Sequence, residues 1–156
     1  MIVYDTREQK NQHILDFLDK KKIKYKKKKI DEGDYTAIIT SRPDMGISRD
    51  LYFNIAVERK NSVDELASNL GEKREDYRDD IRLERELKRA RQRGTMIYLV
   101  VEDKNGMENI EKGNYRSQYG SKAFEAKLAS IEVNYLKGIR FVDKKDAGRT
   151  ILKLLY

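Results

Sequence analysis

Two strand-like segments on either side of a short loop constrain the fold of this chain most. Residues 34–40 and 51–60 have the composition of strands, and the segment between them, Ser41-Arg42-Pro43-Asp44-Met45-Gly46, holds the only proline together with a glycine. We therefore expect a hairpin. In this hairpin Asp34, near the start of the first strand, lies beside Glu58, near the end of the second.

The residues at this end of the hairpin indicate a metal-dependent hydrolytic site. Side chains alternate along a strand, so Lys60 should point to the same face as Glu58, and Arg59 to the opposite face. Mg²⁺ prefers oxygen ligands and retains several waters, so Asp34, Glu58 and the backbone carbonyl of Arg59 could be its protein ligands. Lys60 could orient or activate the attacking water, or stabilise the charge that develops on a phosphoryl group.

The alternative is that Asp34 and Glu58 are ordinary surface carboxylates and that Lys60 is a solvated lysine. The motifs around these residues argue against this alternative. Tyr4-Asp5-Thr6-Arg7-Glu8 ends a short apolar run near the N-terminus, and Asn61-Ser62-Val63-Asp64-Glu65-Leu66 follows the lysine.

Taken in order, these motifs read D-x-R-E from Asp5, G-D-Y from Gly33, and V-E-R-K-x-x-x-D-E-L from Val57. The set resembles the XPF/Mus-type nuclease domain, a branch of the restriction-endonuclease-like, PD-(D/E)xK superfamily, and the resemblance runs from Asp5 to the C-terminus. It implies a single α/β domain over residues 1–156, with a central mixed sheet flanked by helices. It also implies a DNA endonuclease that depends on Mg²⁺ or Mn²⁺ and cuts branched or flapped DNA.

The resemblance assigns roles to further residues. Asp5 would be a metal ligand, directly or through water. The Arg59 side chain belongs to the family motif, and it forms either a structural ion pair or part of the catalytic site. Asp64 either stabilises the first turn of a helix or belongs to a second-metal or water network. Arg7 and Glu8 complete the D-x-R-E motif, and the alternative is that they form a structural pair at the turn between a strand and a helix.

The segment 73–93 is expected to form a helix with an arginine stripe. Its apolar residues Leu83, Leu87 and Ala90 fall on the opposite side. The guanidinium fork suits phosphate oxygens, so the stripe is a candidate DNA-binding surface, although interspersed acids also permit a solvated, salt-bridged face. The lysine-rich segment 20–29 is a weaker candidate. The stripe consists of Arg78, Arg82, Arg85 and Arg89.

Periodicity and capping signals predict the remaining elements. Ser62 and Glu65 form a capping box, so a helix should begin at Val63 and be interrupted at Gly71. Helices are also expected at residues 11–22, 122–137 and 146–155, strands at 2–6, 23–30 (an edge strand), 96–101 and 139–142, and a polar loop at 105–120. His13, the only histidine, has no partner histidine or cysteine nearby in the sequence and is expected to be structural or exposed.

Composition sets the broader limits. A chain of 156 residues is about one domain, and a net charge of +7, with 39% of residues charged, suits a polyanionic partner such as DNA. There is no cysteine for a disulfide or a thiolate site, and neither an apolar run of about 20 residues nor a signal peptide, so we expect a soluble cytoplasmic protein.

Relatives in the XPF/Mus family usually carry a helix-hairpin-helix module after the nuclease domain, and none follows here. DNA would then be held by the nuclease domain itself, by a second copy, or by another protein. The family forms dimers through its C-terminal part, so a homodimer through the helices at 122–137 and 146–155 is expected. Two other functions remain open, namely a nuclease of broader specificity in phage DNA processing or restriction, and a non-catalytic DNA-binding module.

Overall fold

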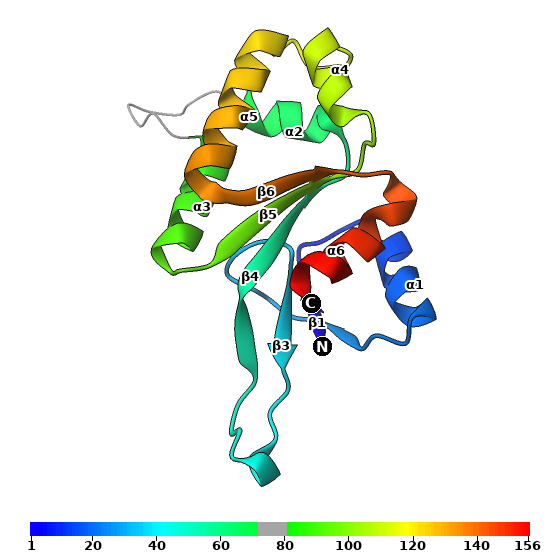
Figure 1. Ribbon diagram of the computed structural model, residues 1–156, viewed down its shortest axis with the longest axis vertical. Helices are drawn as coiled ribbons and strands as arrows, with labels where there is room; N and C mark the ends of the chain where they lie inside the picture. The colour runs from blue at the N-terminus through cyan, green and yellow to red at the C-terminus, as the bar shows by residue number, and fades with distance from the viewer. Residues whose placement is uncertain (72–80) are drawn as a thin grey trace.

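A six-stranded mixed sheet forms the centre of the protein (Figure 1). The computed structural model describes residues 1–71 and 81–156. The strands follow the order β2-β1-β3-β4-β5-β6, in which β3 is antiparallel to β1 and β4 and the other pairs are parallel. Their bounds are β1 (Ile2–Tyr4), β2 (Tyr25–Lys27), β3 (Tyr35–Ile39), β4 (Leu51–Lys60), β5 (Met96–Val101) and β6 (Leu136–Phe141). The expected α/β fold with a central mixed sheet is confirmed.

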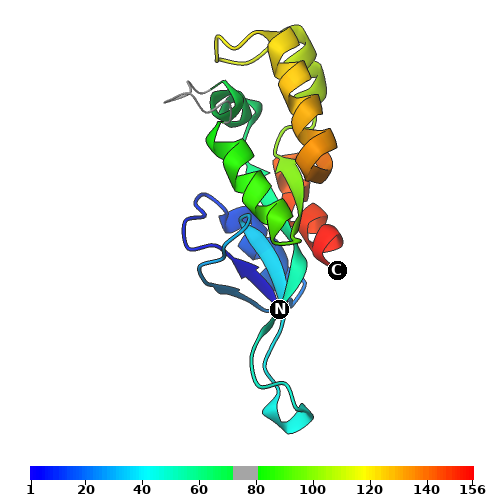
Figure 2. The ribbon, with the colours of Figure 1, turned by 90° about the vertical axis from the view of Figure 1, so that its left-hand side faces the viewer.

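Helices cover both faces of this sheet (Figures 1 and 2). On one face, α1 (Gln12–Lys20) and α6 (Ala147–Leu155) pack in one apolar cluster with Val57 of β4 and Val100 of β5. On the other face, Ala56 and Leu99 belong to a second cluster. This cluster is completed by α2 (Val63–Leu70), α3 (Arg82–Gln92), α4 (Gly106–Lys112) and α5 (Ser121–Tyr135). Alternation along β4 therefore assigns its side chains to the two cores in turn.

The expected hairpin is present as β3 and β4, which pair from Tyr35↔Val57 to Ile39↔Leu51 with a register shift between Thr36 and Ile38. Its outer part projects beyond the rest of the sheet (Figure 1). At the tip a short 3-10 turn (η1, Pro43–Met45) ends at Gly46, whose left-handed φ of 79° suits glycine. The two arms return to the core side by side, so Asp34 and Glu58 meet at the inner end.

Several local predictions are also confirmed. The Oγ of Ser62 accepts a hydrogen bond from the N–H of Glu65 at 3.0 Å, and α2 begins at Val63 and ends at Leu70, before Gly71. The lysine-rich strand β2 lies at the edge of the sheet, although it covers only Tyr25–Lys27.

Three predicted elements differ from the structure. The segment 105–120 is not all loop, because α4 forms there and buries Gly106 and Ile110, a pattern too short to show periodicity. The helix at 73–93 does not run unbroken, because Ile81 is extended and α3 begins at Arg82, while residues 72–80 lie outside the described part. Strand β6 begins at Leu136, not at residue 139, because its pairing with β5 starts at Leu136↔Ile97 directly after α5.

The apolar residues of α5 and α6 lie mainly inside the protein. Phe124, Leu128 and Ile131 are buried in one core cluster, and Ile151 and Leu155 in the other. Core packing therefore accounts for their periodicity. None of the helices in residues 1–71 and 81–156 has the length and apolar character needed to cross a membrane.

Candidate active site

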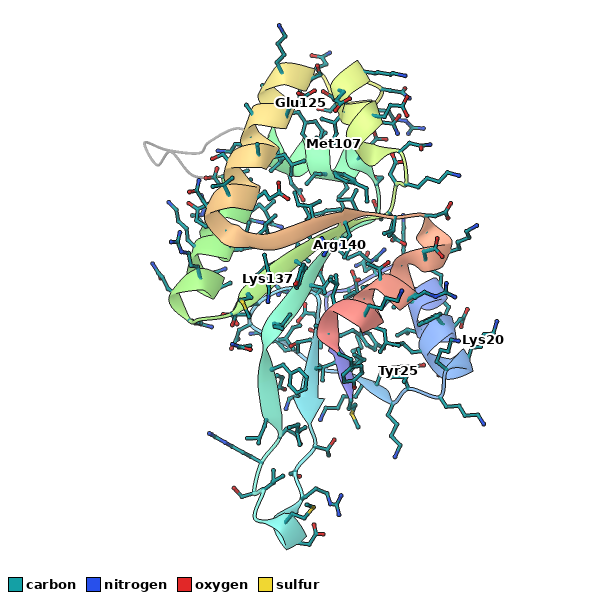
Figure 3. The ribbon with its side chains drawn as sticks, in the orientation of Figure 1. Lys20, Tyr25, Met107, Glu125, Lys137 and Arg140 are labelled. Atoms are coloured by element: carbon teal, nitrogen blue, oxygen red, sulfur yellow. The ribbon has the colours of Figure 1, made fainter. Side chains whose placement is uncertain are left out.

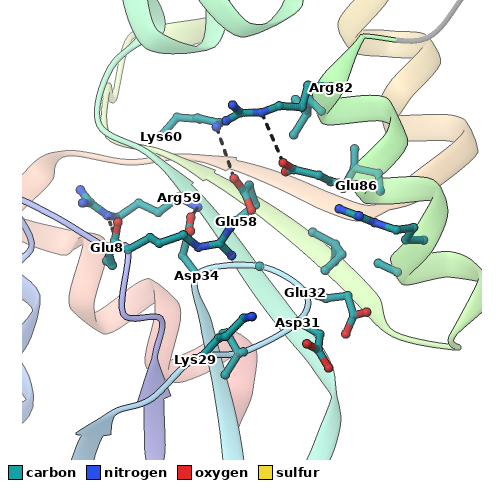
Figure 4. Close-up of a pocket in the computed structure, with 18 of the residues that line it drawn as sticks. Glu8, Lys29, Asp31, Glu32, Asp34, Glu58, Arg59, Lys60, Arg82 and Glu86 are labelled. Carbon is teal, nitrogen blue, oxygen red and sulfur yellow. Dashed lines mark hydrogen bonds and ion pairs between the residues drawn. The ribbon is translucent and has the colours of Figure 1, made fainter. Parts of the chain in front are cut away.

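The candidate site is a cleft of about 530 Å³ on the face of the sheet that carries α3 (Figure 4). Helices α2 to α5 cover the β4–β6 half of this face. On the β1–β3 half, Ile30 from the loop before β3 packs on Val3 and Ile38 instead. The cleft lies between this loop and α3, and Asp34, Glu58 and Lys60 all line it.

Asp34 is fixed at the cleft by its backbone and by its carboxylate. Its N–H donates to the carbonyl of Val57 at 2.7 Å, and its Oδ2 accepts from the N–H of Arg59 at 2.8 Å. Gly33 makes this approach possible, because its φ is 76° and a Cβ there would lie 2.9 Å from the Cβ of Ala56. The Gly-Asp pair of the motif thus has a direct structural reason.

Glu58 and Lys60 lie on the same face of β4, as alternation predicted. The Nζ of Lys60 is 3.3 Å from Oε1 of Glu58, and the two side chains are 10% and 15% exposed. Burial, together with the neighbouring Glu58 carboxylate, raises the pKa of Asp34 well above its ordinary value. Burial also raises the pKa of Glu58, although Lys60 partly offsets this effect. Two carboxylates in one partly desolvated site are stabilised in the charged form by a cation.

The Arg59 side chain points to the opposite face, where it is part of a buried ionic network. Its Nε donates to Oε2 of Glu8 at 2.7 Å, its second terminal nitrogen donates to the carbonyl of Gln9 at 2.7 Å, and Glu102 accepts from the first. Although burial lowers the pKa of Arg59, the bond to Glu8 raises it above its ordinary value. Of the two roles expected for this side chain, the geometry favours the structural ion pair.

His13 completes this network on the far side, since its Nε2 lies 2.5 Å from Oε2 of Glu102. The structural role expected for His13 agrees with this contact.

The backbone of Arg59, in contrast to its side chain, points along the sheet toward β3, since its N–H donates to Oδ2 of Asp34. The carbonyl of Lys60 accepts from Glu102 on the β5 side, and that of Val57 accepts from Asp34 on the β3 side. By alternation the carbonyl of Arg59 points toward β3, beside Asp34.

Asp5 and Asp64 are not brought into the cleft wall. The Asp5 side chain is 1% exposed, and its oxygens accept from the N–H of Ile30 at 3.0 Å and from Nε of Arg7 at 2.7 Å. Burial raises the pKa of Asp5, but these hydrogen bonds outweigh it and hold the pKa below its ordinary value. Asp64 accepts from the N–H of Arg116 at 2.9 Å, so it ties α2 to the loop before α5.

The arginine stripe is only partly on the cleft. Leu83, Leu87 and Ala90 are buried, as expected, and Arg82 and Arg89 line the cleft with Arg93, which ends the helix. The Nε of Arg82 lies 3.4 Å from Oε1 of Glu86, a residue that also lines the cleft and lies between Arg82 and Arg89 in the sequence of α3. Arg85 is exposed but lies outside the cleft lining, and Arg78 falls outside the described residues.

Several cleft residues were not among the residues predicted for the site. Glu86 and Arg93 lie four and eleven residues after Arg82, which is close to one and three turns of a helix. Extending the helical period from Arg82 along the whole segment would therefore have placed both on the same side. Lys10 had no such local signal. Its place depends on how the loop after β1 folds over the site. The polar residues of this kind are Gln9, Lys10, Asp31, Glu32, Asn61, Glu65, Glu86 and Arg93, whereas Arg7 and Glu8 were named only as part of the D-x-R-E motif and Lys29 only as part of the lysine-rich segment.

Comparisons with known proteins agree with this geometry. The model of the ERCC4 domain family matches residues 4–154. In structure, the chain is similar to XPF from Aeropyrum pernix, with 19% identity and a TM-score of 0.66 over 99% of this chain and 64% of that one. It is also similar to XPF from Aeropyrum pernix in complex with DNA, with 19% identity and a TM-score of 0.64 over 99% and 62% of the two chains.

These structural similarities show the XPF nuclease fold. The chain spans less than two thirds of the length of either solved relative. No curated protein matches the sequence at a significant level.

Proposed function

Since the chain belongs to the ERCC4 domain family, we propose that it is a Mg²⁺-dependent endonuclease that hydrolyses phosphodiester bonds in DNA, and that Mn²⁺ can replace Mg²⁺. The observation that carries this proposal is the group of Asp34, Glu58 and Lys60 at the floor of a cleft with basic residues on its walls. This arrangement supplies ligands for a hard cation, a positive charge near the reacting phosphate, and a path for a polyanion.

The residues at the site fit a hard divalent cation. Asp34 and Glu58 are carboxylates held close together at partly buried positions, where a cation offsets their repulsion. Within residues 1–71 and 81–156, no three His, Cys, Asp or Glu side chains are grouped as a metal cage. The ligand set would therefore be the two carboxylates, the carbonyl of Arg59 and water, a set that Mg²⁺ accepts. When bound, the cation would polarise the phosphoryl oxygens and lower the pKa of the attacking water.

The chain's own residues would perform the remaining tasks. Lys60, fixed 3.3 Å from Glu58, would orient the attacking water or stabilise the charge on the phosphoryl group. Arg59 and Asp5 would act by holding the loop after β1 and the start of β3 in place. Asp64 would serve α2 as an N-terminal acid and as the partner of the loop at Arg116.

The DNA contacts would come from the cleft-facing side of α3, through Arg82 and Arg89, while Arg85 is exposed on the same helix outside the cleft lining. The net charge of +7 favours a polyanion. The solved relative whose title names a DNA complex supports the same class of ligand. We propose branched or flapped DNA as the substrate because the motifs resemble XPF/Mus-type nucleases.

A homodimer through α5 and α6 would supply a second DNA-binding surface. In its support, Val133 is an 82% exposed apolar residue on α5. Such a dimer would place two cationic clefts on one DNA molecule. Because the proposed substrate is DNA, we propose that the enzyme acts inside the cell.

A cleavage assay tests the proposal. Labelled duplex, flap, fork and four-way junction DNA are incubated with the wild type and with Asp34→Asn and Glu58→Gln, in Mg²⁺, in Mn²⁺ or in EDTA. We expect cleavage by the wild type with either cation, none in EDTA, and none by the two variants. Asp31→Asn is the matched control, because Asp31 also lines the cleft but its side chain is 72% exposed.

Two outcomes would contradict the proposal in different ways. Undiminished cleavage by both variants would mean that the metal site lies elsewhere. If the wild type binds DNA but cleaves none of the substrates with either cation, the chain is a non-catalytic DNA-binding module.

A further inference from the structure

Three cations that line the cleft have no ion-pair partner among the described residues. They are Lys10, Lys29 and Arg89, and each comes from a different element: the loop after β1, the loop before β3, and α3. The other basic residues of the loops and of α3 at the cleft are paired internally, for example Arg7 with Asp5 and Arg93 with Glu32. Unpaired positive charges gathered around one cleft favour an anionic ligand.

Lys10 is held in place by the core of the protein. It has a left-handed backbone conformation, with φ of 52°, which is uncommon for a residue with a side chain. The preceding residues are fixed by Arg59, which donates to the carbonyl of Gln9 and to Glu8, each at 2.7 Å. Such a backbone conformation is maintained when the surroundings determine it. The buried ionic network thus sets the position from which Lys10 reaches the cleft.

Lys29 is anchored in a similar way. The next residue, Ile30, is buried, and its N–H donates to Oδ1 of Asp5 at 3.0 Å. Figure 4 shows Lys29 across the cleft from Arg82 and Glu86, with Glu58 and Asp34 between the two sides. Of the lysines in the segment 20–29, Lys29 alone contributes to the cleft lining among the described residues.

We propose that Lys10 and Lys29 form a second phosphate-binding wall, opposite α3, and that a nucleic-acid strand passes between the two walls over Asp34 and Glu58. This inference rests on the proposed function, because it takes the ligand to be the phosphodiester backbone of DNA. Because the carboxylates on the floor repel phosphate, the basic side chains on the two walls, and not the floor, position the strand, whether or not a metal ion is bound. Contacts of this kind supply affinity and register but carry little sequence information.

Lys22 provides a closely matched control for Lys10. It is also a lysine with a left-handed backbone, with φ of 57°, and it is exposed but does not line the cleft. Its neighbours in the chain, Lys20 and Tyr25, lie on the opposite side of the molecule from α3 (Figure 3). Lys10→Gly and Lys22→Gly each lower the net charge of +7 by one and each place glycine where glycine is unstrained. Neither substitution should impair folding, and thermal unfolding checks this.

The experiment measures binding of labelled duplex DNA in EDTA, over a range of salt concentrations, for the wild type, Lys10→Gly, Lys22→Gly and Lys29→Ala. We expect Lys10→Gly and Lys29→Ala each to reduce the slope of log K against log salt by about 0.9, as for one lost phosphate contact. Lys22→Gly should retain the wild-type slope. Equal slopes for Lys10→Gly and Lys22→Gly, whether reduced or unchanged, would overturn the second wall. If the wild type itself shows no salt-dependent DNA binding, the proposed function fails instead.

Discussion

Replacing Arg59 with methionine should strongly destabilise the protein. Arg59 is 3% exposed and lies between Glu8 and Glu102, which are 8% and 2% exposed. Methionine fills much of the same volume but leaves the Glu8 and Glu102 carboxylates buried without the guanidinium, with only His13 still in contact with Glu102, and it removes the donor to the Gln9 carbonyl. The cost therefore comes from uncompensated buried charge and not from a cavity.

The expected magnitude follows from this geometry. Removing one partner of a buried ion pair costs about 3–5 kcal/mol in unfolding free energy. For a chain of this length, that loss lowers Tm by about 6–20 °C.

Urea unfolding and thermal melts in EDTA measure this effect. Arg42→Met is the matched control, because Arg42 pairs with Asp44 at the hairpin tip with 57% and 64% exposed side chains and should change stability by about 1 kcal/mol or less. Adding Glu102→Gln to Arg59→Met should restore part of the loss. If Arg59→Met unfolds like the wild type and yet no longer cleaves DNA, the side chain acts in catalysis and the structural assignment is wrong.

Three further predictions concern single substitutions. The raised pKa of Asp34 means that the metal-free protein loses stability as pH rises from the ordinary value of 3.8 through the folded value, so Asp34→Asn should gain stability relative to the wild type between acid and neutral pH, as measured by Tm in EDTA. A constant Tm difference would contradict this. Lys60→Ala should lower the cleavage rate at saturating DNA by roughly a hundredfold or more, with little change in Kd, and normal turnover would exclude the proposed role. Gly106→Ala should cost about 1–3 kcal/mol in urea unfolding, because the added Cβ would collide with the ring of Phe141, whereas Gly120→Ala, with nothing within 4 Å but at the N-cap of α5, serves as the control and should cost less, about 1 kcal/mol or below.

Much of the fold could be predicted because its signals are local. Alternation placed Glu58 and Lys60 on one face of a strand and Arg59 on the other, and the capping box located the start of α2 at Val63. The hairpin followed from two strand-like segments around a proline-containing loop. In contrast, α4 was missed because a helix of seven residues with two buried positions shows too little periodicity.

The sequence by itself determined which chemistry the chain could perform. It supplies two carboxylates, Asp34 and Glu58, and a lysine, and the spacing of two between Glu58 and Lys60 puts both side chains on one face of a strand. It did not determine which neighbours each side chain meets. Asp5 and Asp34 are both acids of the motif, yet the Asp5 oxygens accept hydrogen bonds from Ile30 and Arg7, while Asp34 lines the cleft. Only the tertiary structure decided this, because such contacts join residues far apart in the chain, such as Arg59 and Glu8, which are 51 positions apart.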